Sequence, residues 1–157
     1  MTPCIKLLKK TKTAYTLHQY EHESSYNSFG EEAAQKLGVL HKRVFKTLVV
    51  LSDKNEFVVG IVPVSSQLSM KSMAKAVGAK KVAMAGAHDV EKITGYVLGG
   101  VSPLGQKKRL KTIIDESAKE FETIFVSAGK RGLEVELCAN DLHGLLNAKF
   151  ENIATQD

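Results

Sequence analysis

A glycine-rich loop is the stretch of this sequence best suited to chemistry. Residues 95–109 contain an apolar segment that we expect to be a buried strand (residues 96–98), then Gly99, Gly100 and Pro103, then a basic run. Glycine permits positive φ and close approach of the backbone, and proline stiffens the loop. Such a loop can direct N–H groups into a cleft, where they stabilise a carboxylate, a phosphate or a developing oxyanion. The same spacing also fits an ordinary tight turn.

Lys46 is the charged residue with the most informative position. It lies near the start of an apolar run, residues 44–51, which we expect to pair with residues 56–64 as a hairpin. Burying an unpaired ammonium group is costly, so Lys46 either reaches outward to solvent or faces a polar cavity. The sequence leaves both placements open.

The side chains offer few candidates for covalent or metal chemistry. His18 and His22 lie four residues apart, but no third ligand accompanies them, so we expect no metal site. Ser102 lacks the G-x-S-x-G context of a nucleophilic serine. Cys4 and Cys138 form no CxxC pair, and we expect them to be packed residues. The chemistry is therefore expected to depend on backbone groups, one lysine, hydroxyls and aromatic rings.

Composition favours a single domain with a basic surface. The chain has 157 residues, of which 43% are apolar and 25% charged, and its formal net charge is +5. It contains no apolar run long enough to span a bilayer, no signal peptide and no cysteine framework, so we expect a cytoplasmic protein without a membrane partner. Basic pairs at 80–81, 107–108 and 130–131 favour a polyanionic partner, although a solvated basic face is the alternative.

The elements that must position these residues mix helices and strands without a regular parallel rhythm. We expect helices over residues 3–11, 31–37, 69–77, 88–94 and 140–146, and strands over 15–18, 44–51, 56–64, 80–84, 96–98, 110–114, 123–127 and 133–137. This pattern predicts one α+β domain over residues 1–157, with a curved, mixed, barrel-like sheet flanked by helices. The long polar loop 19–30 carries Tyr20 and Phe29, which are placed either to line a pocket or to plug the edge of the core.

Three motifs closely resemble those of the YbaK family. They are FKTL at residues 45–48, TGYVLGGVSPLGQKK at 94–108 and VSAGKRGL at 126–133, and the similarity extends nearly from end to end. This family comprises bacterial Cys-tRNA(Pro) deacylases related to the editing domain of prolyl-tRNA synthetases. The resemblance implies a trans-editing hydrolase that needs no cofactor, acts on misacylated tRNA(Pro) beside prolyl-tRNA synthetase, and has no DNA partner. It also implies that the substrate thiol attacks its own ester, giving a thiolactone and free tRNA.

The resemblance further implies roles for individual residues. Lys46 and Gly100 would be catalytic, with amides of the glycine loop holding the carbonyl oxygen and Lys46 binding the terminal adenosine, its phosphate or the developing charge. The residues implied to bind substrate are Tyr20, Phe29, Thr47, Gly99, Ser102, Ser127, Gly129 and Glu134. The residues implied to contact tRNA are Lys107, Lys108, Lys130 and Arg131.

Two positions depart from the family pattern, and two other functions stay open. Ala128 stands where the family usually has glycine, and it would be strained if that position requires positive φ. Glu134 stands where aspartate is frequent, so its carboxylate reaches further. The chain could instead edit another small aminoacyl-tRNA such as Ala-tRNA(Pro), or it could be a non-catalytic module that binds tRNA or a synthetase.

Overall fold

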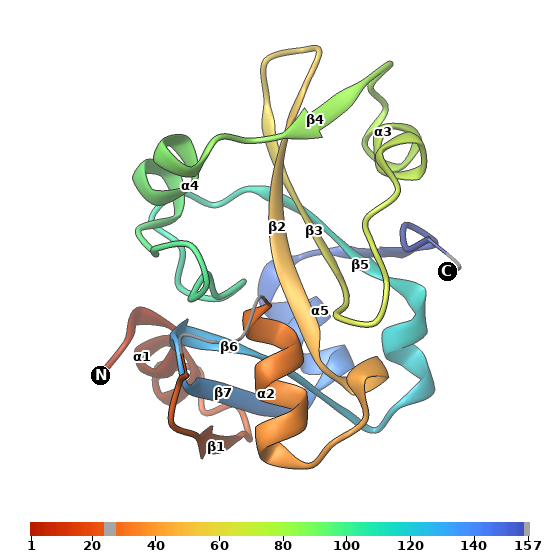
Figure 1. Cartoon of the computed structure of the whole chain (residues 1–157). Helices are drawn as coiled ribbons and strands as arrows, with labels where there is room; N and C mark the ends of the chain where they lie inside the picture. The colour runs from red at the N-terminus through yellow and green to blue at the C-terminus, as the bar shows by residue number, and fades with distance from the viewer. Residues whose placement is uncertain (24–27, 156–157) are drawn as a thin grey trace.

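Two β-sheets, rather than one, organise the chain. The structure is a computed structural model that describes residues 1–23 and 28–155. Within these ranges one sheet is antiparallel, in the order β1–β7–β6, and the other is mixed, in the order β4–β2–β3–β5–β8 (Figure 1). The predicted α+β class with mixed strand directions is confirmed. The expected description as one barrel-like sheet is loose, because neither set of strands closes and the isolated bridge between Val44 and Phe125 is the one pairing between the two sets among the described residues.

The elements follow one another with short connections. The strands are β1 (Thr16–Gln19), β2 (Phe45–Ser52), β3 (Phe57–Pro63), β4 (Val82–Met84), β5 (Lys111–Asp115), β6 (Thr123–Lys130), β7 (Leu133–Cys138) and β8 (Lys149–Glu151). The helices are α1 (Pro3–Lys10), α2 (Phe29–Leu37), α3 (Met70–Val77), α4 (Ala87–Thr94) and α5 (Ala139–Leu146), with 3₁₀ turns η1 (His41–Arg43) and η2 (Glu116–Glu120). None of the helices in the described ranges has the length and apolarity needed to cross a bilayer.

Helix ends follow the capping residues in the sequence. The Ser28 and Ser69 hydroxyls accept hydrogen bonds from N–H groups in the first turns of α2 and α3. Both helices end at a glycine in the left-handed region, Gly38 with φ 68° and Gly78 with φ 73°. Because Ser28 is the cap, α2 starts at Phe29, two residues earlier than predicted, and Phe29 belongs to the helix instead of the loop.

The core lies between the two sheets. Phe45, Val59 and Ile61 of the mixed sheet share one buried cluster with Val126 and Val135 of the antiparallel sheet. A second cluster lies on the other face of the mixed sheet, where α3 packs. β2 therefore contributes side chains to both clusters, as expected for a strand whose successive residues point to opposite faces.

Two sequence predictions about strands are wrong. Residues 96–98 do not form a buried strand: Val97 and Leu98 are 57% and 45% exposed. Tyr96 is buried, but its hydroxyl donates to the carbonyl of Leu104 at 2.6 Å, which ties it to the loop instead of a sheet. In addition, the sequence predicted no strand after residue 146, although β8 pairs in parallel with β5.

Candidate functional site

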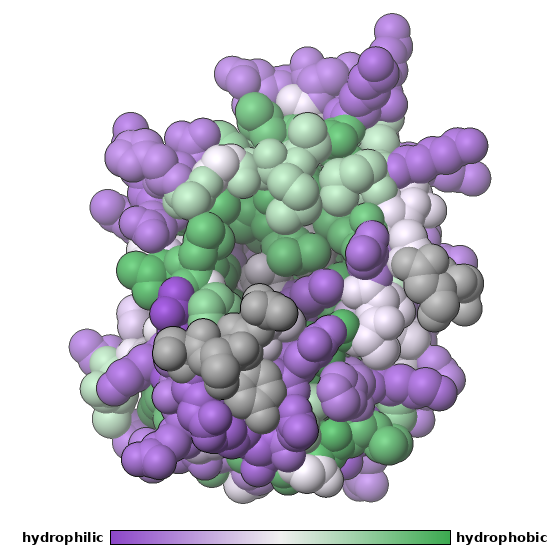
Figure 2. All heavy atoms as spheres, in the orientation of Figure 1, coloured by the Kyte–Doolittle hydropathy of each residue, from purple (hydrophilic) through white to green (hydrophobic). Residues whose placement is uncertain are grey.

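A cavity of about 280 Å³ lies beside the first half of β2. Its lining comprises residues 44–48 of this strand region, residues 28–30 at the start of α2, and Leu98, Gly99 and Val101 of the glycine loop, together with Tyr20, Ser127 and Glu134. Figure 2 shows that apolar side chains gather over β2 and β4 on this face, whereas hydrophilic side chains predominate around α2. The cavity lies between these two regions, since both supply part of its lining.

The cavity is open because one edge of β2 is only half covered. The edge facing β3 is paired along its length, from Phe45 opposite Pro63 to Leu51 opposite Phe57. The other edge pairs with β4 only at residues 50–52. Between the isolated bridge of Val44 to Phe125 and this β4 pairing, the edge has no assigned partner strand, and residues 45–48 reach the lining.

Lys46 lies in the lining of this cavity, which decides between its two possible placements. The structure gives its ammonium group no ion pair with any described carboxylate. Burial lowers the pKa of Lys46 below its usual value, and the nearby charge of Glu31 offsets only part of this effect. A cation without a partner in a partly dry cavity is suited to bind an anionic group of a ligand.

Glu134 places a carboxyl group in the same cavity. It is 6% exposed, it lies opposite Ser127 on β6 and His18 on β1, and no described residue hydrogen-bonds to its carboxyl group. Burial raises the pKa of Glu134 to about 8. A buried carboxyl that lacks a protein donor is suited to bind a cationic group of a ligand.

The aromatic residues Tyr20 and Phe29 both line the cavity, and buried polar contacts hold them. The N–H of Tyr20 donates to the carbonyl of Gly132 at 3.0 Å. The fully buried carboxylate of Glu32 accepts the N–H of Glu23 at 2.6 Å and lies 2.6 Å from Nδ1 of His22, so the segment after Tyr20 is anchored to α2. Burial acts to raise the pKa of Glu32, but these hydrogen bonds outweigh it and leave the pKa lowered.

Arg131 links three walls of the cavity. Its guanidinium lies 4.1 Å from the centroid of the Phe29 ring, in cation–π geometry, and donates to the carbonyl of Leu98 at 3.3 Å. It thereby joins the start of α2, the β6–β7 turn and the glycine loop. The sequence indicated a tRNA contact for Arg131 and gave no sign of this bridging position.

The glycine loop contains a turn that uses the Gly100 amide internally. The N–H of Gly100 donates to the carbonyl of Val97 at 3.0 Å, and Gly99 has φ 89°, as the third position of a type II turn requires. Gly99 and Val101 line the cavity, whereas Gly100 packs against the backbone of Lys130. This geometry disfavours Gly100 as an oxyanion donor, because its N–H is bonded within the turn and the residue is not part of the lining.

Gly99→Ala is expected to disturb both stability and the cavity. An added Cβ would lie 2.4 Å from Cε2 of Phe29 and 2.7 Å from Nε of Arg131, and it would occupy a positive φ. We expect the variant to unfold at a temperature several degrees lower in a thermal melt, a loss of about 1–3 kcal/mol. Gly144→Ala is the matched control, since its Cβ meets no atom within 4 Å and it lies inside α5. Equal melting temperatures for the two variants would contradict the close packing at Gly99.

Two further residues predicted to bind substrate lie outside the cavity lining. Ser102 is fully buried, and its hydroxyl accepts the N–H of Leu104 at 3.2 Å. Gly129 has φ 105°, and an added Cβ would lie 2.6 Å from the ring of Tyr96. The requirement for positive φ thus falls on Gly129, while Ala128 is buried without positive φ and carries no such strain.

The predicted tRNA-contacting residues fall into two groups. Lys130 and Arg131 line a second cavity, of about 480 Å³, which shares Tyr20 with the first. Lys107 and Lys108 are exposed and line neither cavity, and their N–H groups donate to the carbonyls at the end of α4. Lys130 and Arg131 are therefore adjacent to the candidate site, whereas Lys107 and Lys108 lie at the surface and line neither of these two cavities.

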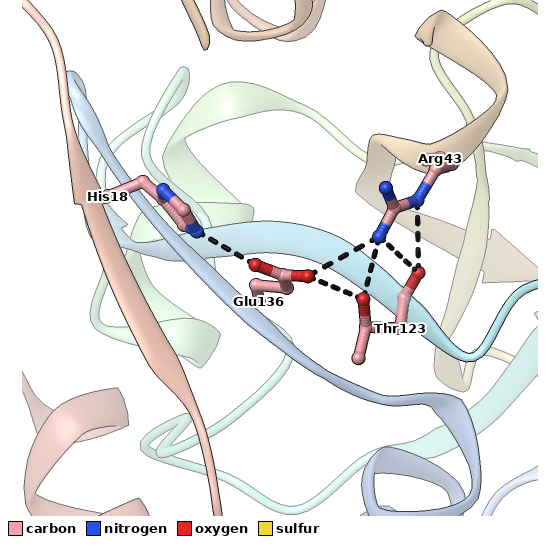
Figure 3. A network of polar contacts seen from close by, with 4 residues as sticks. All are labelled: His18, Arg43, Thr123 and Glu136. Atoms are coloured by element: carbon pink, nitrogen blue, oxygen red, sulfur yellow. Dashed lines mark hydrogen bonds and ion pairs between the residues drawn. The ribbon is translucent and has the colours of Figure 1, made fainter. Parts of the chain in front are cut away.

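A polar network that the sequence did not predict fixes the start of β2 (Figure 3). Arg43 donates to the Thr123 hydroxyl at 2.6 Å and to the Glu136 carboxylate at 3.4 Å, and Nε2 of His18 lies 3.0 Å from the same carboxylate. The Thr123 hydroxyl is the largest cause of the lowered pKa of Glu136. Arg43 lies three residues before Lys46, and Glu136 lies two residues from Glu134 on the same face of β7. The network therefore supports both charged groups of the cavity.

Comparison with known proteins decides the family. Residues 22–145 match the family model of the aminoacyl-tRNA editing domain. The chain belongs to this family. The matched residues include every residue of the cavity lining except Tyr20.

Relatives of this editing domain occur both as free-standing proteins and within synthetases. The chain is 37% identical over 99% of its length to EbsC of Enterococcus faecalis, which is named as a Cys-tRNA(Pro)/Cys-tRNA(Cys) deacylase and is covered to 94%. It is 27% identical over 68% of its length to 19% of the proline–tRNA ligase of Lactobacillus helveticus. Its fold matches, with a TM-score of 0.85 and 19% identity, a crystal structure described as a trans-editing enzyme for prolyl-tRNA synthetase, and 99% of each chain is covered.

Proposed function

We propose that this editing domain is a trans-acting deacylase that removes cysteine from misacylated Cys-tRNA(Pro). The observation that carries the proposal is a cavity that contains an unpaired cation, Lys46, and a buried carboxyl, Glu134, which receives no hydrogen bond from any described residue. These two groups match the two ends of the aminoacylated 3′-terminal nucleotide of a charged tRNA, which has a cationic α-amino group and an anionic phosphate. The name of EbsC, which resembles the chain over almost its whole length, supports the same assignment.

The lining of the cavity favours a reaction in which the substrate supplies the nucleophile. It contains no cysteine and no histidine among the described residues, and the hydroxyl of Ser127 accepts the N–H of Gly129 at 3.1 Å. In the proposed reaction the cysteinyl sulfur bonds to the ester carbonyl carbon, the ester C–O bond breaks, and the thiol proton is transferred to the released 3′-oxygen. The products are a cyclic thiolactone and free tRNA.

The residues of the chain position this substrate and stabilise charge. Glu134 binds the α-ammonium group, which favours its ionised form despite burial. Lys46 binds the phosphate or the negative charge that develops on the carbonyl oxygen, and Tyr20 and Phe29 enclose the adenosine. Lys130 and Arg131, in the second cavity, contact the next part of the acceptor end. Lys107 and Lys108 lie further away and steer the tRNA electrostatically.

We also propose that the protein acts beside prolyl-tRNA synthetase in the cytoplasm. Prolyl-tRNA synthetases charge cysteine by mistake because it is close to proline in size and a pocket rejects such a molecule poorly. The similarity to part of a proline–tRNA ligase supports a shared substrate. A ternary complex with the synthetase and tRNA is the expected working assembly.

A deacylation panel tests the proposal. Cys-, Ala-, Ser- and Pro-charged tRNA(Pro) are incubated with the protein, and loss of the ester is followed over time. We expect Cys-tRNA(Pro) to react fastest and Ser-tRNA(Pro) slowly, since a thiol ionises far more readily than a hydroxyl and is the better nucleophile. Fastest loss of alanine would indicate Ala-tRNA(Pro) editing. Retention of all four esters, with salt-sensitive binding, would indicate a binding module.

The double variant Cys4→Ala and Cys138→Ala should retain turnover of Cys-tRNA(Pro). Neither thiol lines the cavity, and burial raises the pKa of Cys4 to about 11, which keeps it protonated. We expect kcat within about threefold of the unmodified protein, because neither side chain is part of the reacting group. Loss of turnover by a folded variant, checked by circular dichroism, would point to a thiol of the protein as the nucleophile.

A further inference from the structure

Two backbone hydrogen bonds at the ends of the β2–β3 ladder show which residues of β2 bond β3 and which point to the opposite edge. The N–H of Val64 donates to the carbonyl of Val44 at 2.8 Å, and the N–H of Ser52 donates to the carbonyl of Glu56 at 2.9 Å. In an antiparallel ladder, residues alternate between those that bond the partner strand and those that point away from it. The even-numbered residues of β2 therefore bond β3, and the odd-numbered residues direct their N–H and C=O groups to the opposite edge.

Thr47 is an odd-numbered residue at a gap in that opposite edge. On one side of the gap, Val44 bridges Phe125 of β6. On the other side, the carbonyl of Val49 accepts the N–H of Ala85 at 3.0 Å. In the β2–β4 register, the residue opposite Thr47 would be Ala87. Ala87 is instead the first residue of α4, so β4 does not extend as far as Thr47. No strand pairing among the described residues covers Thr47 on this edge.

The side chain of Thr47 adds a second observation. Its hydroxyl is buried and has no hydrogen-bond partner, the one such side-chain atom among the described residues. The residue also lines the candidate cavity. Buried polar groups are normally paired, and each exception calls for an explanation. The unpaired hydroxyl of Thr47 therefore lies on a residue whose N–H and C=O face a strand edge without an assigned partner strand. Such an edge can bind an extended chain by strand addition.

We propose that the backbone of Thr47 binds the aminoacyl group of the substrate as one residue of an added antiparallel strand. The N–H of Thr47 donates to the ester carbonyl oxygen, and the C=O of Thr47 accepts one N–H of the α-ammonium group, whose other protons are available to Glu134. This rests on the proposed function. An aminoacyl ester carries its amino nitrogen and carbonyl in the order found in a peptide residue, so it satisfies one hydrogen-bonded pair of the ladder.

This assignment gives the carbonyl oxygen a main-chain donor on a rigid strand. The Thr47 N–H takes the place that the sequence suggested for Gly100, whose N–H is used within its own turn. Because the contact involves main-chain groups alone, it holds any L-aminoacyl ester in the same position. Selectivity for cysteine then comes from the reactivity of its thiol.

Replacement of one backbone N–H by an ester oxygen tests the proposal. The α-hydroxy acid analogue of valine is inserted at position 47 by nonsense suppression, and Thr47→Val, made in the same way, is the matched control. Thr47→Val removes the hydroxyl and keeps the backbone N–H, so its kcat for Cys-tRNA(Pro) is the reference for the backbone ester at the same position. The ester-containing variant should show kcat lower than this control by about 100-fold, the effect of removing one oxyanion donor.

A second backbone ester tests whether the loss of kcat comes from the missing oxyanion donor or from a weakened sheet. The α-hydroxy acid analogue of leucine at position 48 removes an N–H that bonds β3. We expect this variant to melt at a lower temperature than the variant with the ester at position 47, yet to retain more of its kcat at a temperature where both are folded.

The outcomes distinguish the two proposals. Equal kcat for the position 47 ester and Thr47→Val overturns the role of Thr47 and leaves the deacylase function intact. If the position 47 ester melts at as low a temperature as the position 48 ester, the N–H of Thr47 is bonded within the sheet. That result also overturns the proposed role of Thr47. If the unmodified protein hydrolyses none of the four charged tRNAs, the proposed function itself fails.

Discussion

Lys46→Ala should lower kcat/KM for Cys-tRNA(Pro) hydrolysis by about 100-fold or more, the size of effect expected for loss of a group that stabilises transition-state charge. Stability should not fall, since the ammonium has no ion pair with a described residue and its burial is itself unfavourable. Single-turnover kinetics with charged tRNA and a thermal melt measure the two quantities.

The division of this loss between kcat and KM identifies what Lys46 binds. A loss confined to KM indicates a contact that is equal in the ground state and the transition state, as with a phosphate. A loss in kcat indicates a contact with the developing charge. Lys81→Ala is the matched control, because Lys81 is exposed and lies outside the cavity. If Lys46→Ala and Lys81→Ala hydrolyse the substrate equally fast, Lys46 has no part in the reaction.

Glu134→Gln should weaken substrate binding and yet stabilise the fold at alkaline pH. Burial raises the folded-state pKa of Glu134 to about 8 from the usual value of 4.5. As pH rises through this window, the unfolded chain loses the proton and the folded chain keeps it, so the folded state becomes less stable relative to the unfolded state. Glutamine has no proton to lose, so the variant avoids this penalty. Its melting temperature should exceed that of the unmodified protein by about 4 °C or more at pH 8, and the difference should shrink toward pH 5.

The activity of the same variant has a distinct pH signature. Since kcat/KM reports groups in the free enzyme, we expect its value for the unmodified protein to rise as Glu134 ionises near pH 8. Glu134→Gln should lose this rise and show KM at least about tenfold higher, because a neutral amide binds an ammonium group weakly. Glu120→Gln, an exposed change, is the control. A pH profile unchanged by Glu134→Gln would show that another group titrates there.

Local signals in the sequence predicted much of the secondary structure. Gly38, Ser69 and Gly78 are capping residues that act within one turn of a helix, so the end of α2 and the position of α3 could be read from the sequence. The Ser28 cap was missed, and the start of α2 was therefore predicted two residues late. The segment at residues 96–98 has strand-like composition, but the hydrogen bond of Tyr96 to Leu104 outweighs that propensity. The division into two sheets depends on pairing between distant strands, and no local pattern specifies it.

The sequence predicted several residues of the candidate site, but it did not predict the directions of their backbone groups. Lys46 and Glu134 both line the cavity, where the family resemblance implied that they would act. The direction of a backbone N–H depends on turn type and strand register. The N–H of Gly100 is therefore bonded to Val97, whereas that of Thr47 faces a strand edge without an assigned partner strand. Arg43 was missed because its partners Thr123 and Glu136 come from strands far along the chain.

The network around Arg43 has a consequence for motion in the cavity. It joins the segment just before Lys46 to the strand that carries Glu134, so the two walls cannot separate unless Arg43 leaves Thr123 and Glu136 (Figure 3). The spacing between the two charged walls is thereby set before any ligand arrives, and little ordering entropy is lost when one binds. The amide hydrogens of Lys46 and Leu48, which bond β3, should accordingly exchange with deuterium at nearly the same slow rate in the free protein and in its complex.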